Sequence, residues 1–354
     1  MGHVHRFYPA FARPRDRCER WFSAETHPVP IRTTRCRLQR VGRRLVVLLL
    51  AGASARAQEA DFSVEAIRGR IEVLRPDLEA ALGAPLGGPV DVVVTTPDAL
   101  ADSIANDFLA ERANIEGGPR GDGLKDAAAI AGRALRHSTL GRVESERGVL
   151  EICPENFLVL TEIEPSWRGM LDRDFLDVLL LHELVHVFQE RRFAGFLGAP
   201  SSLEQLQARH AVLEGHAQYV AREAAKRRGL DAAFALFEKV NTEVPPSVKD
   251  PALRRSIEDS VAQLAFVYTD GEKFFRAVTE KLGYEKALDR VFSSPPATVR
   301  AIRTPQASSM RRLSKSERQL TGVRSIARST ARIRTASIRR RRFARTATTT
   351  RTSS

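Results

Sequence analysis

The sequence predicts an α+β protein, with a small N-terminal α/β part that contains a short sheet and a helical C-terminal part. Two observations favour this fold class. Runs rich in β-branched residues, which are typical of strands, lie at 89–96 and within 140–156. From Asp172 to residue 292, nearly every segment repeats its apolar residues at helical spacing. With 43% hydrophobic residues, the chain of 354 residues is able to bury a sizeable core.

The N-terminal part, residues 58–170, is expected to alternate helices and strands. Its elements, in chain order, are a helix over 64–83, a strand over 89–96, a helix over 97–113, a flexible loop over 116–124 and two short strands within 140–156. Pro76 interrupts the first helix, because proline removes a hydrogen-bond donor from a helix interior. Pro97 and Asp98 open the second helix, and Gly148 lies at the entry of the last strand.

The C-terminal part, residues 171–304, completes a single predicted domain over 58–304. Its expected helices cover 172–192, 202–228, 231–240, 251–264, 270–282 and 284–292.

The net charge of +13 belongs to the two ends of the chain. Residues 1–44 carry a net charge of +8 and residues 305–354 carry +13, so residues 45–304 carry −8. Because the expected folded domain is mildly acidic, the sequence argues against a domain that binds nucleic acid.

A short apolar run near the N-terminus predicts a secretory signal peptide over 41–57. Arg43 and Arg44 precede the run, and the small-residue motif Ala55-Arg56-Ala57 follows it. Cleavage after Ala57 would export the mature chain to the periplasm or the extracellular space, and an uncleaved signal would anchor it in a membrane. Residues 1–40 do not fit this pattern, which favours translation starting near Val41 over a genuine extension or a signal anchor.

The mature chain would keep one cysteine. Cys18 and Cys36 precede the expected cleavage point, so only Cys153 remains and no intramolecular disulfide is available.

The tail, residues 305–354, is rich in Arg, Ser and Thr and has too few apolar residues to fold alone. We expect a disordered segment, or a shifted reading frame that begins near residues 303–310. The alternative is an electrostatic arm that contacts anionic surfaces or nucleic acid, although no specific nucleic-acid partner is expected.

The stretch "LLLHELVHVFQERR" at 179–192 carries the candidate chemistry. His182 and His186 are four residues apart, so on a helix their imidazoles lie on one face and are able to reach one ion. Glu183 lies about 100° around the helix, where it approaches a metal-bound water without binding the metal. This is the HExxH arrangement of zinc hydrolases, in which Zn²⁺ lowers the pKa of its water and the glutamate takes the proton. The alternative is a core helix whose histidines are satisfied by protein partners.

A third zinc ligand is expected on the following helix, 203–227, which offers His210, Glu214 and His216. Glu214 shares a helix face with His210, whereas His216 points about 200° away from Glu214. We favour Glu214 as the ligand over both histidines. His210 is then a catalytic candidate that orients the site or stabilises an oxyanion, or simply an exposed histidine beside Arg209.

The two segments "HELVHVFQ" and "LEGHAQYVA" together resemble the gluzincin zinc metallopeptidases, in particular the peptidase MA-like group. The resemblance implies that His182, His186 and Glu214 bind zinc and that Glu183 is the general base. It covers about residues 140–305, where "LGRVESERGVLEI" is similar to the strand pair before the active helix and "FVYTDGEKFFRAVTEKLGYEKALDRVF" to the helix pair that covers the site. The same resemblance implies a zinc cleft between the α/β part and the helical part.

The chain departs from the family pattern at Gln218, where classical members have an acid that orients a histidine ligand. Tyr268 is a candidate for binding the tetrahedral intermediate, and Tyr219 is a weaker candidate; both residue types more often serve in packing.

The predicted function is an exported zinc-dependent peptidase that acts on a peptide or protein substrate. The alternative is a catalytically inactive scaffold of the same fold that binds partners at a membrane or wall. Neither the substrate nor the oligomeric state is indicated by the sequence.

Overall fold

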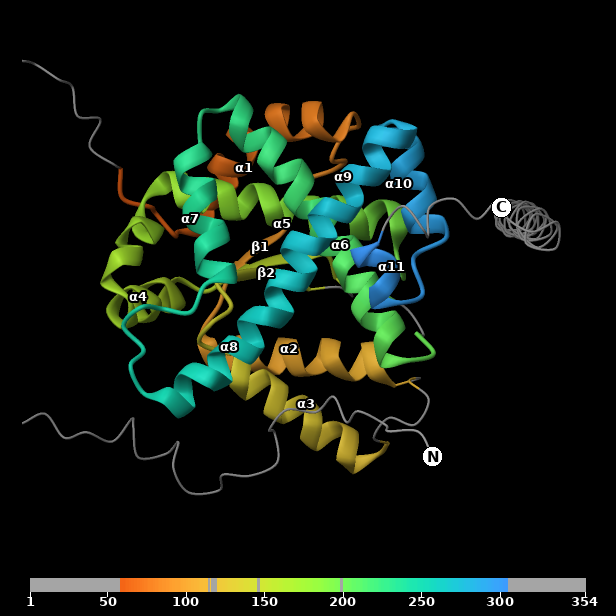
Figure 1. Cartoon of the computed structure of the whole chain (residues 1–354). Helices are drawn as coiled ribbons and strands as arrows, with labels where there is room; N and C mark the ends of the chain where they lie inside the picture. The colour runs from red at the N-terminus through yellow and green to blue at the C-terminus, as the bar shows by residue number, and fades with distance from the viewer. Residues whose placement is uncertain (1–57, 114, 116–119, 145–146, 198–199, 305–354) are drawn as a thin grey trace, which may run out of the picture.

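The computed structural model describes residues 58–113, 115, 120–144, 147–197 and 200–304 (Figure 1). Helices form most of this part of the chain, and one three-stranded sheet lies near its N-terminal half. The α+β class predicted from the sequence is therefore confirmed. The expectations for residues 1–40, 41–57 and 305–354 lie outside the described residues. None of the described helices is long and apolar enough to span a membrane.

The sheet is small and mixed. Strand β3 (Val149–Ile152) lies at its centre, parallel to β1 (Val92–Val94) and antiparallel to β2 (Gly141–Glu144). The predicted strand pair is thus confirmed. Its turn includes Gly148 at φ 63°, a left-handed conformation that glycine adopts without steric cost. Strand β2 lies at the edge of the sheet, so one side of its backbone has no strand partner among the described residues.

Helix α1 (Val64–Leu82) supports the sheet with a continuous apolar stripe. Its N-cap Ser63 accepts a hydrogen bond from the backbone N–H of Ala66, and Gly83 at φ 64° ends it. Pro76 lies inside the helix without ending it, so the predicted interruption is wrong. The reason is packing, because one side of the helix is buried along its whole length through Ile67, Ile71, Leu74, Leu78 and Leu82.

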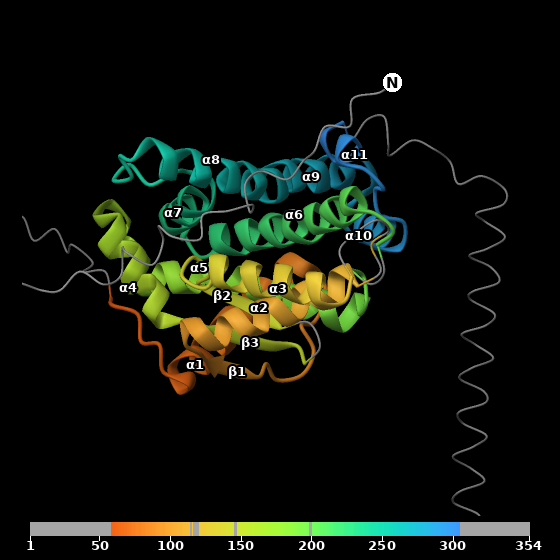
Figure 2. The same ribbon diagram turned by 90° about the horizontal axis from the view of Figure 1, so that it is seen from below.

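Two helices that the sequence pattern did not indicate complete the N-terminal part. Helix α3 (Asp122–Leu135) lies side by side with α2 (Pro97–Arg112), and together they form the lower surface of the molecule (Figures 1 and 2). Residues 122–124, predicted as loop, form the first turn of α3. Helix α4 (Pro154–Ile163) begins directly after β3, and the buried Cys153 is its N-cap residue.

The C-terminal part is helical throughout, and the six helices predicted there are confirmed. In chain order its elements are η2 (Pro165–Leu171), α5 (Arg173–Phe193), α6 (Leu203–Arg227), α7 (Asp231–Thr242), α8 (Pro251–Ala265), η3 (Phe266–Asp270), α9 (Gly271–Leu282), α10 (Tyr284–Ser293) and α11 (Val299–Arg303).

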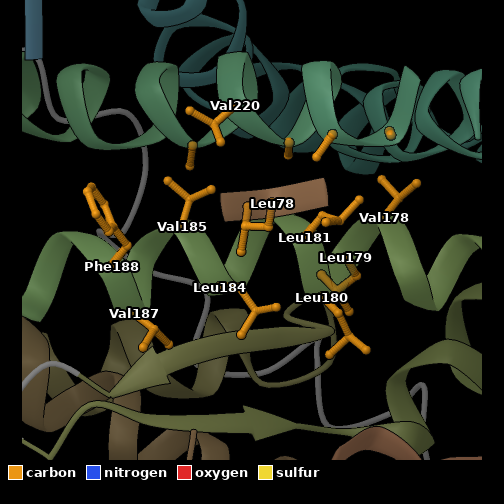
Figure 3. Close-up of a cluster of buried hydrophobic side chains, with 14 of the residues drawn as sticks. Leu78, Val178, Leu179, Leu180, Leu181, Leu184, Val185, Val187, Phe188 and Val220 are labelled. Carbon is orange, nitrogen blue, oxygen red and sulfur yellow. The ribbon is translucent and has the colours of Figure 1, made fainter. Parts of the chain in front are cut away.

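Helix α5 is the centre of the main hydrophobic core. Figure 3 shows Val178, Leu181 and Val185 pointing toward the helix that carries Val220, while apolar side chains on the opposite side of α5 point toward the strands. All residues of α5 from Phe175 to Val185 are buried. A helix that is apolar on several sides has to be enclosed by other elements, and here α6, α7, α1 and the sheet enclose it.

Helices α6 and α9 approach each other closely at a pair of glycines. A Cβ atom built on Gly215 would lie 2.1 Å from the carbonyl carbon of Gly271, and one built on Gly271 would lie 2.2 Å from the carbonyl oxygen of Ala211. Both positions therefore exclude any side chain. This approach fixes η3, which precedes α9, against the part of α6 that carries Glu214.

We predict that Gly215→Ala lowers the free energy of unfolding by about 2 kcal/mol or more, because the added methyl group overlaps backbone atoms. Gly69→Ala is the matched control: Gly69 lies inside α1, and a Cβ there meets nothing within 4 Å. Gly69→Ala should raise the free energy of unfolding by roughly 0.5–1 kcal/mol, because alanine has a higher helix propensity than glycine. Urea unfolding of both variants measures the difference. A Gly215→Ala protein as stable as Gly69→Ala would contradict the close approach of α6 and α9.

Candidate metal centre

Three side chains from two helices bring their ligand atoms to one point. Nε2 of His182 lies 3.1 Å from Oε2 of Glu214 and 3.1 Å from Nε2 of His186, and the latter lies 3.4 Å from the same carboxylate oxygen. His182 and His186 come from α5 and Glu214 comes from α6. Of the three candidates on the second helix, the structure therefore brings Glu214 to the histidine pair.

The three separations fit a tetrahedral zinc site. With Zn–N and Zn–O bonds of about 2.1 Å, two ligands of a tetrahedron are about 3.4 Å apart. The observed separations of 3.1, 3.1 and 3.4 Å are close to this value. Two nitrogens and one carboxylate oxygen are also a donor set that catalytic zinc sites use.

Gln189 orients His186, a role that the sequence analysis did not assign. Nε2 of Gln189 donates to the carbonyl oxygen of Leu213 at 2.9 Å and lies 2.9 Å from Nδ1 of His216. Its Oε1 must then accept a hydrogen bond from Nδ1 of His186, at 2.7 Å. The proton of a neutral His186 is thereby placed on Nδ1, which leaves the Nε2 lone pair for a metal. The i+3 spacing from His186 to Gln189 was the available sequence signal.

His216 belongs to the support of the site. Since its Nδ1 accepts from Gln189, its Nε2 carries the proton and donates to the hydroxyl of Tyr284 at 2.9 Å. Burial lowers the pKa of His216 to about 3, and the nearby His186 and Arg192 act in the same direction. His216 is therefore neutral, and both of its nitrogens are occupied.

His210 lies one turn before Glu214 on α6, outside the group of three ligands. Its Nε2 is 3.2 Å from Oε2 of Glu111 on α2. Burial acts to lower the pKa of His210, but Glu111 outweighs it and raises the pKa. The structure thus places His210 in a contact between α6 and α2.

Glu183 is buried beside the ligands, with 6% of its surface exposed. Burial raises the pKa of its carboxyl, whereas His186 and His182 act to lower it. For Glu214, burial also acts upward, but His186 and His182 outweigh it and hold the pKa well below its usual value. The two carboxylates therefore differ: Glu214 remains ionised as a ligand, and Glu183 is able to hold a proton.

Tyr268 lies beside His182. It belongs to η3, a π-helical turn of a kind that is frequent at functional sites, and its ring centroid is 5.5 Å from that of His182. Burial raises the pKa of Tyr268 well above its usual value, and the charges of Glu214 and Glu183 act in the same direction. Its hydroxyl therefore keeps its proton and is a donor. Tyr219 instead stacks on Tyr284, with ring centroids 6.3 Å apart.

Gln218 follows Glu214 by one helical turn and is fully buried, at 1% exposure. Its Oε1 has no hydrogen-bond partner among the described residues, and neither has Nδ1 of His182. The amide therefore stands in the position where the resemblance implies an acid, and its Oε1 does not accept a hydrogen bond from Nδ1 of His182.

Comparison with known proteins gives no family assignment. No family model and no curated protein matches this chain. One similar solved structure is described as "a putative hydrolase with a novel fold from Chloroflexus aurantiacus"; it is 19% identical and aligns with a TM-score of 0.47 over 70% of this chain and 90% of that one. At this identity and TM-score, the similarity does not establish an activity for this chain.

We predict one bound zinc per chain in the full-length protein and its loss in His182→Ala and Glu214→Ala, because each variant removes one of three ligands. His210→Ala is the control and should keep its zinc, since His210 contacts Glu111 and not the cluster. Elemental mass spectrometry of the dialysed proteins measures the content. Zinc that remains bound in Glu214→Ala would contradict this ligand set.

Zinc affinity should rise with pH. In the metal-free protein, burial acts to lower the pKa of His186, but Glu214 outweighs it and raises the pKa to about 9. Below that pH the ring is protonated, and a metal has to displace this proton, so affinity should increase by up to about tenfold per pH unit until pH 9. Calorimetric titrations in buffers of different ionisation enthalpy count the released protons. Zinc binding at pH 7 without proton release would contradict the prediction.

Proposed function

We propose that this protein is an exported zinc-dependent peptidase that hydrolyses peptide bonds. The observation that carries the proposal is the convergence of the ligand atoms of His182, His186 and Glu214, at separations suited to tetrahedral zinc, beside the buried Glu183. Glutamate is the usual proton acceptor in such sites. Glu183 follows His182 directly, so its carboxylate lies near the metal position without being a ligand.

His182, His186 and Glu214 would hold the zinc, which would supply a Lewis acid that activates water and polarises the substrate carbonyl. The carboxylate of Glu183 is placed to accept a proton from the attacking water and to deliver it to the leaving amine nitrogen. Burial raises the pKa of the Glu183 carboxyl in the metal-free protein, and in the mechanism this carboxyl holds the proton between the two steps. Gln189 keeps the imidazole of His186 in one orientation throughout.

The hydroxyl of Tyr268 donates a hydrogen bond to the developing oxyanion. It suits this role because it remains protonated and its ring lies 5.5 Å from that of the ligand His182.

Peptides are favoured as substrates by the resemblance of "HELVHVFQ" and "LEGHAQYVA" to the gluzincins and by the position of β2. This edge strand packs against α5, which carries the histidines, and its outer edge, which has no strand partner among the described residues, offers backbone groups to an extended peptide.

We predict that Glu183→Gln lowers the hydrolysis of fluorescently labelled casein by about 10²–10⁴-fold while one zinc per chain stays bound, because the amide cannot accept the proton. Elemental analysis and the activity assay are made on the same preparation. Turnover retained in Glu183→Gln would contradict the mechanism.

Tyr268→Phe extends the same experiment. It should lower kcat by about 10²-fold with little change in KM, as expected for a donor that acts in the transition state. Tyr219→Phe is the matched control, because Tyr219 stacks on Tyr284 outside the ligand group, and it should leave both constants nearly unchanged.

A further inference from the structure

Helix α2 carries three polar side chains on one face, and each contacts the body of the protein. Ser103, Asp107 and Glu111 are spaced four residues apart, so they lie above one another along the helix. Oγ of Ser103 donates to Oε2 of Glu151 at 2.8 Å, Asp107 accepts a hydrogen bond from the guanidinium of Arg142, and Glu111 pairs with His210 at 3.2 Å. The inner face of α2 is therefore polar.

The apolar contacts of α2 are made with α3 instead. The buried apolar residues of these two helices lie outside the main hydrophobic cluster, which includes α5, α6 and the sheet; they are Leu100, Ala101, Leu124 and Ala128. A Cβ atom on Gly132 of α3 would lie 2.2 Å from the carbonyl oxygen of Ala101, so the two helices are closely packed on each other. Helices α2 and α3 thus form a unit with its own apolar contacts, attached to the body by polar pairs.

Arg142 is the central polar partner of this unit. It lies on the edge strand β2 opposite Glu151 of β3, so the two side chains share one face of the sheet. Only 14% of the Arg142 side chain is exposed, its Nε is 3.8 Å from Oε2 of Glu151, and its Nη2 binds Asp107. Its Nη1 is buried and has no hydrogen-bond partner among the described residues.

Strand β2, which carries Arg142, packs against α5, which carries the candidate catalytic residue Glu183. Burial lowers the pKa of Arg142, and the charges of Glu151 and Glu183 oppose that shift. The effect is mutual, since Arg142 acts to lower the pKa of Glu183. Since β2 is also the edge strand proposed to hold the peptide, the Arg142 guanidinium is placed to contact residues that flank the scissile bond.

We propose that Arg142 binds a carboxylate of the substrate and that Asp107 of α2 occupies this position in the absence of substrate. The inference rests on the proposed peptidase function and specifies its substrate class. Guanidinium binds carboxylate through two parallel hydrogen bonds, and Arg142 has both Nη2, now held by Asp107, and the unpartnered Nη1 to offer. When a substrate carboxylate replaces Asp107, the buried guanidinium of Arg142 stays paired with one carboxylate. The exchange therefore does not leave a buried charge without a partner.

The exchange requires α2 to move away from Arg142. The α2–α3 unit is able to move as one piece, because the movement would break its polar pairs with the rest of the protein and keep its own apolar contacts.

The substrate carboxylate is either the C-terminal group of the peptide or an acidic side chain beside the scissile bond, which have the same chemistry.

The first test uses the zinc-loaded full-length protein and three matched peptide libraries. One has free C-termini and no acidic residues, the second is amidated without acidic residues, and the third is amidated with one glutamate per peptide. We expect one carboxylate-bearing library to be cleaved at least about tenfold faster than the neutral amides. The first library identifies a C-terminal carboxylate, and the third an acidic side chain. Equal cleavage of all three would overturn the inference and leave the peptidase function intact.

Variants then connect the preference to the proposed residue. In Arg142→Gln the ratio of the cleavage rates of the preferred and the neutral library should fall to about one. In Asp107→Asn the KM for the preferred library should fall severalfold, because the carboxylate that competes with the substrate is gone. Asp98→Asn is the matched control on α2, since Asp98 is exposed and pairs with Arg136 at 3.2 Å on the surface. Asp98→Asn should change neither the preference between the libraries nor the KM for the preferred library. An unchanged preference in a folded Arg142→Gln protein would overturn the inference.

A second measurement does not depend on turnover. Hydrogen exchange of the α2 amides should rise when acetyl-diglycine or acetyl-glutamate amide is added at millimolar concentration, and acetyl-diglycine amide should have no effect. If no library is cleaved but this response appears, the carboxylate site stands and the peptidase function fails. If a library is cleaved but neither acid changes the exchange of α2, the displacement of Asp107 is wrong.

Discussion

The site depends on one constraint: polar groups inside a helix that is apolar on several sides must have partners. His182, Glu183 and His186 lie within α5, where burial without a partner would cost several kcal/mol for each group. Protein side chains satisfy most of this demand, through Gln189 on α5 and Glu214 on α6. One ligand atom from each of His182, His186 and Glu214 lies within 4.8 Å of the others, and this is the arrangement in which a metal ion completes the set of partners.

The support of the site extends through a chain of oriented hydrogen bonds. The carbonyl of Leu213 fixes the amide of Gln189, which determines the protons of His186 and His216, and His216 in turn donates to Tyr284 on α10. A change at α10 therefore reaches the ligand His186 through two intervening side chains. The glycine contact between α6 and α9 acts alongside this chain, because it holds Tyr268 and Glu214 near each other without an intervening side chain.

The helices around α5 and the α2–α3 unit are held in place by different kinds of contact, and these contacts differ in how easily they break. The helices around α5 share one continuous apolar core, whose separation would expose a large apolar area to water. The α2–α3 unit contacts the same body through Ser103, Asp107 and Glu111, whose polar groups water or a ligand is able to satisfy. The structure thus joins a rigid ligand helix to a covering unit that is held by exchangeable contacts.

The sequence alone determined the fold class, the six helices of the C-terminal part and the candidates His182, Glu183, His186 and Glu214, because these depend on local periodicity and on spacing along a helix. It missed α3 and α4, and it wrongly interrupted α1 at Pro76, where the packing of the buried helix face outweighs the unfavourable propensity of proline. The partners of His210 and His216, the orienting role of Gln189 and the pairing of Arg142 with Asp107 were decided only by the tertiary structure. Each of these contacts joins side chains according to which helix faces which, and the helical period of one segment does not contain that information.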